Sequence, residues 1–141
     1  MPHISQKPLS EEEFKRIYKE FIRSVSRFKD QKSFEQFFWE FLTPTEKVML
    51  AKRLAVIVLL NKGLSSYEIW KLLNVSPSTI ERLGVKLDRN GYKHIVKTLS
   101  DKKVKFIKFV EALVFILEPP PYHASKKKYL EYKRRMDRFL S

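Results

Sequence analysis

The sequence of 141 residues contains no cysteine, only three glycines and only three histidines. The absence of cysteine excludes a disulfide framework, a thiol nucleophile and a thiolate metal site, and it fits a reducing cytosol. The glycines form no phosphate-cradling loop, and His3, His94 and His123 lack the spacing of metal ligands. We therefore expect neither an enzyme nor a metal site.

Long apolar runs are also missing. The most apolar stretch, Val104 to Leu117, spans 14 residues and is interrupted by three charged side chains, so it is too short for a bilayer core of about 30 Å. Residues 1–13 contain no apolar segment of the kind found in secretory signals. We expect no membrane contact and a cytoplasmic protein of bacterial type, associated with the nucleoid.

Acidic residues are few compared with basic ones, 16 against 29, and the net charge is +13. Such an excess creates a long-range field that attracts phosphate, but a basic protein that is merely soluble would have the same composition. Hydrophobic residues make up 43% and aromatic residues 13% of the chain, so we expect it to fold. The charge alone leaves both interpretations open.

Caps and apolar spacing predict an all-α protein of six or seven helices. Three helix starts have a hydroxyl cap followed three residues later by Glu or Gln: Ser10 with Glu13, Ser33 with Gln36, and Thr43 with Glu46. The first helix has apolar residues from Phe14 to Phe28 on one face, and the second has an aromatic stripe that we interpret as core, namely Phe34, Phe37, Phe38 and Phe41. The third is apolar nearly all round from Leu54 to Leu60, which implies burial on several sides, and Gly63 ends it.

Residues 65–87 have the pattern of a helix-turn-helix, two short amphipathic helices separated by a turn. Ser65 with Glu68 caps the first helix, Ser76 caps the second, and Pro77 takes the first position of the second. A buried stripe on the second helix consists of Ile80, Leu83 and Leu87. The N-terminal residues of a docked recognition helix meet base edges, so the outward residues of this helix are candidates for DNA contact.

The candidate DNA-binding residues are Ser76, Pro77, Ser78, Thr79, Glu81, Arg82, Lys71, Lys86 and Arg89. Short hydroxyl side chains and free amide protons in the first turn can hold phosphate oxygens, and Arg82 can donate two hydrogen bonds to guanine. The alternatives for Arg82 are pairing with Glu81 or Asp88, or solvation. Glu81 could accept from cytosine, but an exposed or ion-paired position suits its charge better. The two lysines and Arg89 could contact phosphates or serve only solubility.

The remainder of the chain divides into a turn, two further helices and a basic tail. Asp88 to Gly91 predict the turn, and Tyr92 to Leu99 a short helix. Another helix is expected from residue 101 to residue 118, where a run of three prolines ends it. We therefore divide the chain into a helix-turn-helix domain at 1–100 and a C-terminal helical extension at 101–141. Its tail has a net charge of +5 over the last twenty residues, interleaved with aromatics, and either contacts nucleic-acid phosphates or packs on a partner.

Several of these segments resemble the Trp repressor family. In order along the chain, Leu42-Thr43-Pro44-Thr45-Glu46, Arg53, Gly63 and Thr79-Ile80-Glu81-Arg82 match its L-T-P-x-E opening, mid-helix arginine and T-I-x-R recognition helix. The resemblance spans about residues 30–100, and residues 87–92 are more similar to a Trp-repressor-like branch with an N-x-G-Y type turn. It implies an all-helical, intertwined homodimer that presents two helix-turn-helix units to a palindromic operator in double-stranded DNA.

The resemblance also implies an effector site. The family's tryptophan lies between the central and recognition helices, at positions that correspond here to Leu42, Thr43, Arg53, Thr79 and Arg82. Two residues depart from the family pattern, since Leu83 replaces a glycine and Lys86 replaces a serine near the ligand amine. A leucine fills space and a lysine repels an ammonium group, so tryptophan fits poorly. Another small-molecule co-repressor and no effector at all are the alternatives, and the second is favoured.

Trp70 and Asn74 are further points of interest in the motif. Trp70 stands where the family has lysine, and it either points to the DNA backbone or fills a gap between helices, which is the more common place for tryptophan. Asn74 replaces the frequent turn glycine, because asparagine tolerates the left-handed conformation. Taken together, the sequence predicts a sequence-specific DNA-binding transcriptional regulator, a repressor acting as a homodimer. A nonspecific architectural nucleic-acid binder and a helical protein-interaction module are the alternatives.

Overall fold

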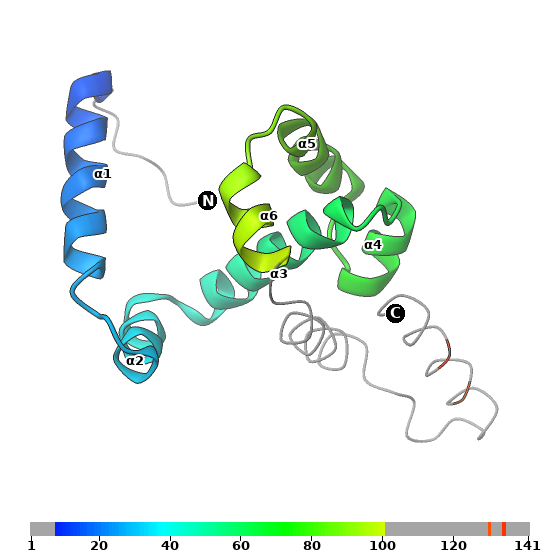
Figure 1. Ribbon diagram of the computed structural model, residues 1–141, viewed down its shortest axis with the longest axis horizontal. Coiled ribbons are helices and arrows are strands. Elements are labelled where there is room, and N and C mark those ends of the chain that lie inside the picture. Colours follow the sequence, from blue (N-terminus) through cyan, green and yellow to red (C-terminus); the bar gives the residue numbers. More distant parts are fainter. Residues whose placement is uncertain (1–7, 101–129, 131–133, 135–141) are drawn as a thin grey trace. The chain divides into compact units, whose positions relative to one another are not determined.

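The computed structural model describes residues 8–100, 130 and 134, and residues 8–100 contain six helices and no strand (Figure 1). They are α1 (Glu11–Val25), α2 (Gln31–Phe41), α3 (Pro44–Asn61), α4 (Ser66–Leu73), α5 (Pro77–Asp88) and α6 (Lys93–Ser100). The predicted all-α class is confirmed. The chain divides into two compact units, Met1–Lys47 and Val48–Ser141, and α3 runs from one into the other. The expected helix at 101–118 lies outside the described residues, as does almost all of the basic tail.

Helix α1 begins at the predicted capping box. The Ser10 N–H donates to the Glu13 carboxylate at 2.8 Å, and the Glu13 N–H donates to the Ser10 hydroxyl at 3.2 Å. The helix ends at Val25, so Phe28 lies in the following turn and not on the helix as expected. The hydroxyls of Ser24 and Ser26 donate hydrogen bonds to the carbonyls four residues back. These bonds compete with the backbone hydrogen bonds of the helix and favour its end here.

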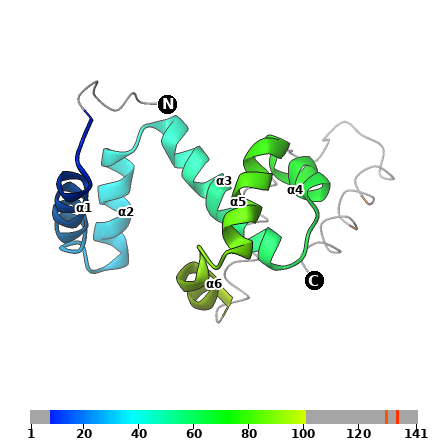
Figure 2. The same ribbon diagram turned by 90° about the horizontal axis from the view of Figure 1, so that it is seen from above.

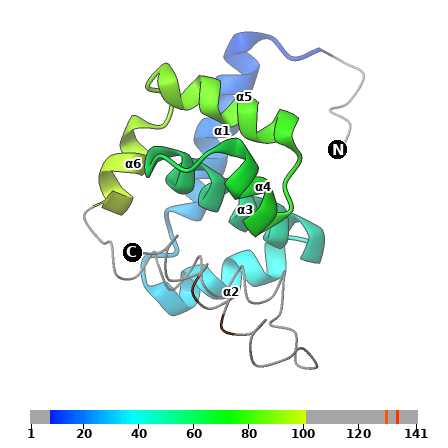
Figure 3. The same cartoon turned by 90° about the vertical axis from the view of Figure 1, so that its right-hand side faces the viewer.

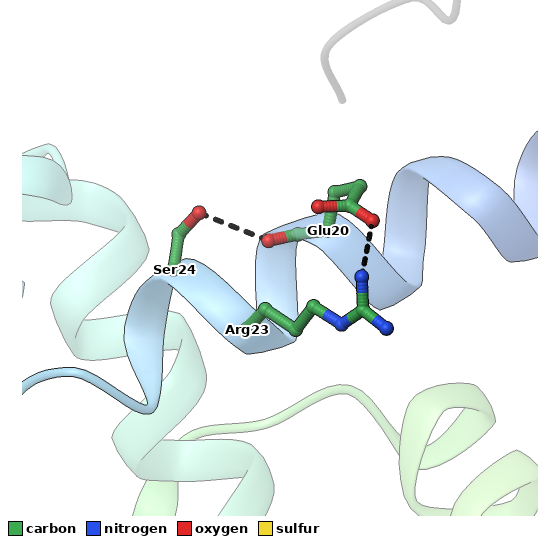
Figure 4. Close-up of polar contacts among 3 residues, drawn as sticks. All are labelled: Glu20, Arg23 and Ser24. Carbon is green, nitrogen blue, oxygen red and sulfur yellow. Dashed lines mark hydrogen bonds and ion pairs between the residues drawn. The ribbon is translucent and has the colours of Figure 1, made fainter.

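Several polar side chains of α1 interact with one another within the helix (Figure 4). Arg23 Nη1 lies 2.9 Å from Glu20 Oε1, and the hydroxyl of Ser24 donates to the carbonyl of Glu20 at 2.9 Å. A second pair joins Lys15 and Glu11, one turn apart. Exposed pairs of this kind contribute only a few tenths of a kcal/mol each. They leave the opposite, apolar side of α1 as the side available for packing.

Helix α2 begins three residues earlier than the sequence predicts. Its N-cap is Asp30, whose carboxylate accepts from the N–H of Ser33 at 2.9 Å, so the predicted capping box of Ser33 with Gln36 is wrong. Gln36 instead donates to Glu40 at 2.6 Å along the helix. Aspartate caps a helix as well as serine does. Starting at Asp30 adds almost a turn of helix, so this start is favoured over one at Ser33.

The aromatic residues of the first unit contact one another but are not buried. Phe28 and Phe37 lie 4.6 Å apart between ring centroids, and Phe21 and Phe41 lie 5.9 Å apart. Yet neither α1 nor α2 has a single buried residue, and Phe34 and Phe41 are exposed. The interpretation of the α2 stripe as core is therefore wrong for the single chain, because two helices cannot cover each other's apolar faces completely.

Helix α3 starts and ends as predicted. The Glu46 N–H donates to the Thr43 hydroxyl at 3.2 Å, and the Glu46 carboxylate accepts from the N–H of Thr43 at 2.8 Å. At the other end Gly63 has φ +90° and donates to the carbonyl of Leu60, while Leu64 donates to that of Leu59. These two bonds close the helix in the usual way for a left-handed C-terminal residue.

The cap at Thr43 makes the stability of α3 depend on pH. Hydrogen bonds from the N–H and then the hydroxyl of Thr43 lower the pKa of Glu46 below its ordinary value. Because the folded pKa is the lower one, the carboxylate stabilises the fold fully above its unfolded pKa and loses this contribution as the pH falls through the folded pKa. We expect the thermal midpoint of the native chain to fall more steeply than that of Glu46→Gln between about pH 5 and about pH 3.

A matched control for this prediction is Glu35→Gln, which removes an exposed carboxylate from α2 outside any helix cap. Thermal unfolding followed by circular dichroism over the same pH range should give a curve parallel to that of the native chain. If Glu46→Gln is also parallel to the native chain, the cap contributes nothing that depends on ionisation.

The second unit has a compact core on α3. The buried residues of this helix are consecutive, from Ala55 to Leu59, and Ile69, Leu72, Leu73 and Ile80 pack against most of them. This confirms the predicted burial of α3 on several sides. After α5, Asn90 adopts a left-handed φ of 59° and Gly91 donates to the carbonyl of Lys86 at 2.8 Å. A Cβ on Gly91 would lie 2.9 Å from that carbonyl oxygen, so glycine is required where the chain turns into α6.

Candidate nucleic-acid interface

Helices α4 and α5 form the predicted helix-turn-helix and both pack on α3 (Figures 2 and 3). Ser65 and Glu68 make a complete capping box at α4, and Asn74 ends the helix with a left-handed φ of 51°. Both features were predicted. Lys52 of α3 donates to the carbonyl of Asn74 at 3.5 Å. Three residues, 74–76, separate the two helices, so the core contacts of α4 also position α5.

The first turn of α5 is exposed. Ser76, Pro77 and Ser78 are open to solvent, Thr79 is half-buried, and Ile80 is the first fully buried residue. The hydroxyl of Ser76 caps the helix by accepting from the N–H of Thr79 at 3.4 Å, and it also lies 2.8 Å from the hydroxyl of Thr79. Small side chains at an uncovered helix start allow another molecule to approach the backbone closely.

Only part of the expected amide donation is available in this turn. Pro77 has no amide proton, and the N–H of Thr79 also donates to the carbonyl of Ser76 at 3.0 Å. Among the described residues nothing accepts from the N–H of Ser78, so this group and the Ser78 hydroxyl are the donors that an incoming phosphate can use.

Arg82 lies one turn further along α5 and is exposed. Its Nη2 donates weakly to the Thr79 hydroxyl at 3.4 Å. Within residues 8–100 the ion pairs are those on α1, so Arg82 pairs with neither Glu81 nor Asp88. The remaining alternative is a solvated arginine, whose guanidinium keeps donors free for another molecule. Glu81 is likewise exposed and outside any ion pair in the described part of the chain.

The other basic candidates lie at the surface, two of them close to aromatic rings. Lys71 Nζ lies 5.2 Å from the centroid of the Trp70 ring, and Lys86 Nζ lies 4.8 Å from that of Tyr92. Arg89 is the exposed C-cap of α5. All three cations are free to meet phosphates, but contact with DNA stays a prediction for each of them.

Trp70 does not fill a gap between helices. It is exposed, and its ring lies 5.6 Å from that of Tyr67 on the side of α4 that faces away from the core. Ile69, Leu72 and Leu73 already cover α3, so no inward position remains for the indole. Tyr67 was not predicted as the partner of Trp70, although a spacing of three residues on a helix places the two rings side by side.

The residues implied as effector contacts are divided between the two units. Leu42 and Thr43 belong to the first unit, where Thr43 is occupied in the cap of α3, and Arg53, Thr79 and Arg82 belong to the second. Leu83 packs against the core cluster, as expected of a bulky residue. A cleft of about 680 Å³ lies elsewhere, lined by Leu60, Asn61, Leu87, Asp88, Asn90, Lys93, Val96 and Lys97. The structure therefore leaves the effector assignment a prediction.

Residues 16–100 match the family model described as Trp repressor protein. The chain belongs to the Trp repressor family. The match covers more than half of the chain and runs from within α1 to the end of α6. The comparisons with curated proteins and with solved structures gave no match.

Membership of the Trp repressor family indicates a DNA-binding transcription regulator, and the family consists of regulators rather than enzymes. The matched region contains the whole of α4 and α5, so the exposed first turn of α5 is part of the family's domain. Among residues 8–100, 130 and 134, no group of three or more His, Asp or Glu side chains is arranged to hold a metal ion. The same residues include no helix with the length and apolar character to cross a bilayer.

Proposed function

We propose that this chain is a transcriptional repressor that binds a palindromic operator in double-stranded DNA as a homodimer, with α5 as the recognition helix. The observation that carries the proposal is the exposed first turn of α5, together with an Arg82 that has no ion-pair partner in the described residues. Membership of the Trp repressor family supports the regulatory role. Such a protein acts on the nucleoid, in the cytoplasm of a bacterial-type cell.

The roles of the individual residues follow from their positions. Arg82 would donate two hydrogen bonds to a guanine in the major groove. Ser76, Ser78 and Thr79 would lie against the backbone, while Lys71, Lys86 and Arg89 would neutralise phosphates around the groove. Pro77 fixes the start of the helix and adds no bulk there. Glu81 is a poor neighbour for phosphate and would face either a cytosine or water.

The first unit supports the homodimer. Its two helices have no buried residue, and α1 exposes one apolar face: Phe14, Ile17, Tyr18, Phe21 and Ile22. A contiguous apolar surface of this kind is rare on a monomer and marks an interaction site. In a two-fold symmetric dimer, the α1 face of each protomer is buried against the other protomer. The dimer then presents two recognition helices to two half-sites.

No effector is required by this proposal. Leu83 packs against the core, and Lys86 stands where the family has a serine near the ligand amine, which disfavours an amino acid with its ammonium group. A small-molecule co-repressor without an ammonium group remains a second candidate. The domain division at residue 100 and phosphate contacts by the basic tail likewise remain proposals from the sequence.

The test begins with selection of bound duplexes from a random DNA pool. The native chain should select a palindrome, and Arg82→Ala should weaken binding to it by about 5-fold to 150-fold, the equivalent of about 1–3 kcal/mol for a bidentate guanine contact. Competition binding at two salt concentrations measures the preference for the selected site over other sequences. Specific recognition keeps this preference at both salts, whereas backbone binding falls for all sequences together.

The matched control is Arg27→Ala, which removes the same charge from an exposed position in the turn between α1 and α2. It should reduce affinity for all duplexes slightly and equally. No selected sequence, with equal losses for both variants, would point to the architectural binder. No nucleic-acid binding at all would point to the protein-interaction module.

A further inference from the structure

Two aromatic residues on the outward side of α4, with Lys71 beside them, form a surface whose rings have no role in the proposed repressor function. We call Tyr67, Trp70 and Lys71 the α4 aromatic patch. Tyr67 is 63% and Trp70 is 39% exposed, their ring centroids lie 5.6 Å apart, and Lys71 Nζ lies 5.7 Å and 5.2 Å from the two rings. The spacing of three and four residues places all of them on one stripe of the helix.

The α4 aromatic patch contributes nothing to the core. The inward side of α4 is complete without it, because Ile69, Leu72 and Leu73 fill the space against α3. Exposing a tyrosine and a tryptophan side by side costs solubility. Exposed aromatic residues that the packing of the fold does not require are candidates for a functional role.

We propose that the α4 aromatic patch binds single-stranded DNA, with bases stacked on Trp70 and Tyr67 and a neighbouring phosphate paired with Lys71. Aromatic side chains beside a cation are the usual elements of single-strand binding, because every base has a face that can stack. In a duplex these faces are covered by neighbouring base pairs, so a stacking surface selects unpaired strands. The net charge of +13 favours a polyanion as the partner of this patch.

The choice of DNA rests on the same family membership as the proposed function, but not on sequence-specific binding of a duplex. The patch lies on the helix that precedes the recognition helix, so it is brought to DNA whenever α5 docks. An unpaired strand at a locally opened duplex would then lie within its reach. This activity adds to operator binding and shares only Lys71 with it.

Fluorescence of Trp70 gives a direct readout. The chain has two tryptophans, so Trp39→Phe leaves Trp70 as the single indole. Titration with an oligothymidine of about twenty nucleotides should quench this emission as a base stacks on the ring. In the native background, Trp70→Ala and Tyr67→Ala should each weaken oligothymidine binding about tenfold, measured by anisotropy of a labelled strand. Lys71→Ala should reduce the salt slope by about 0.7.

Trp39 provides the matched control, because it is also exposed and has Lys47 Nζ 3.7 Å from its ring centroid. Trp39→Ala should bind oligothymidine as the native chain does. Equal losses for Trp39→Ala and Trp70→Ala, or no quenching of Trp70, would overturn the proposal. Tighter binding of an oligouridine of the same length would overturn the choice of DNA. The measurement contains no duplex, so its result does not depend on whether an operator exists.

Discussion

Ile80→Ala is expected to lower the free energy of unfolding by about 2–5 kcal/mol, the usual cost of truncating a fully buried isoleucine. Ile80 is 0% exposed and belongs to the cluster that joins α5 to α3 and α4. The loss combines the transfer energy of the removed carbons with the cavity that remains. Since a domain of this size has only about 5–15 kcal/mol of stability, urea unfolding followed by circular dichroism should show a clear shift of the midpoint.

The matched control for Ile80 lies on the same helix. Val85→Ala removes two methyl groups from an exposed position of α5, so its effect on stability should stay within about 0.5 kcal/mol. DNA binding should separate the two variants as well, because Ile80 fixes how the first turn of α5 is presented and Val85 does not. Equal effects of both substitutions would mean that α5 does not pack on α3.

The local features of this fold could be predicted from the sequence because they depend on neighbouring residues. The caps at Ser10, Thr43, Ser65 and Ser76 each need only one side chain and an amide three residues away, and the structure confirms all four. The start of α2 was missed because Asp30 and Ser33 are both good caps. Spacing alone does not decide between them.

Burial was harder to predict than helix position. The aromatic stripe of α2 and the indole of Trp70 have the composition of a core, but whether they are covered depends on elements far away in the sequence. The structure leaves Trp70 exposed and buries none of the α2 stripe, of which Phe34 and Phe41 are exposed. In the candidate site, the spacing of apolar residues along α5 predicted which of its positions face outward. Whether Arg82 is solvated or ion-paired depends instead on the side-chain directions of Glu81 and Asp88. A sequence pattern does not give that direction.

The combined variant Phe14→Glu with Ile17→Glu is expected to convert the proposed homodimer into a monomer. Both side chains lie on the apolar face of α1 and are 59% and 56% exposed in the single chain, so the monomer should tolerate the change. In a two-fold interface each substitution is present in both protomers, so two copies of each carboxylate are buried. An unpaired buried charge costs several kcal/mol. We expect the dissociation constant of the dimer to rise at least about a hundredfold, measured by sedimentation equilibrium.

The control makes the same change in net charge on the opposite side of α1. Arg16→Gln with Lys19→Gln lowers the net charge by two, as the glutamates do, but both residues lie on the polar face of the helix. This variant should remain a dimer. DNA binding should follow the same division, because a monomer holds one recognition helix and loses the second half-site. If the glutamate variant stays dimeric, the chain associates through another surface, and the exposed aromatic residues of α2 become the first place to examine.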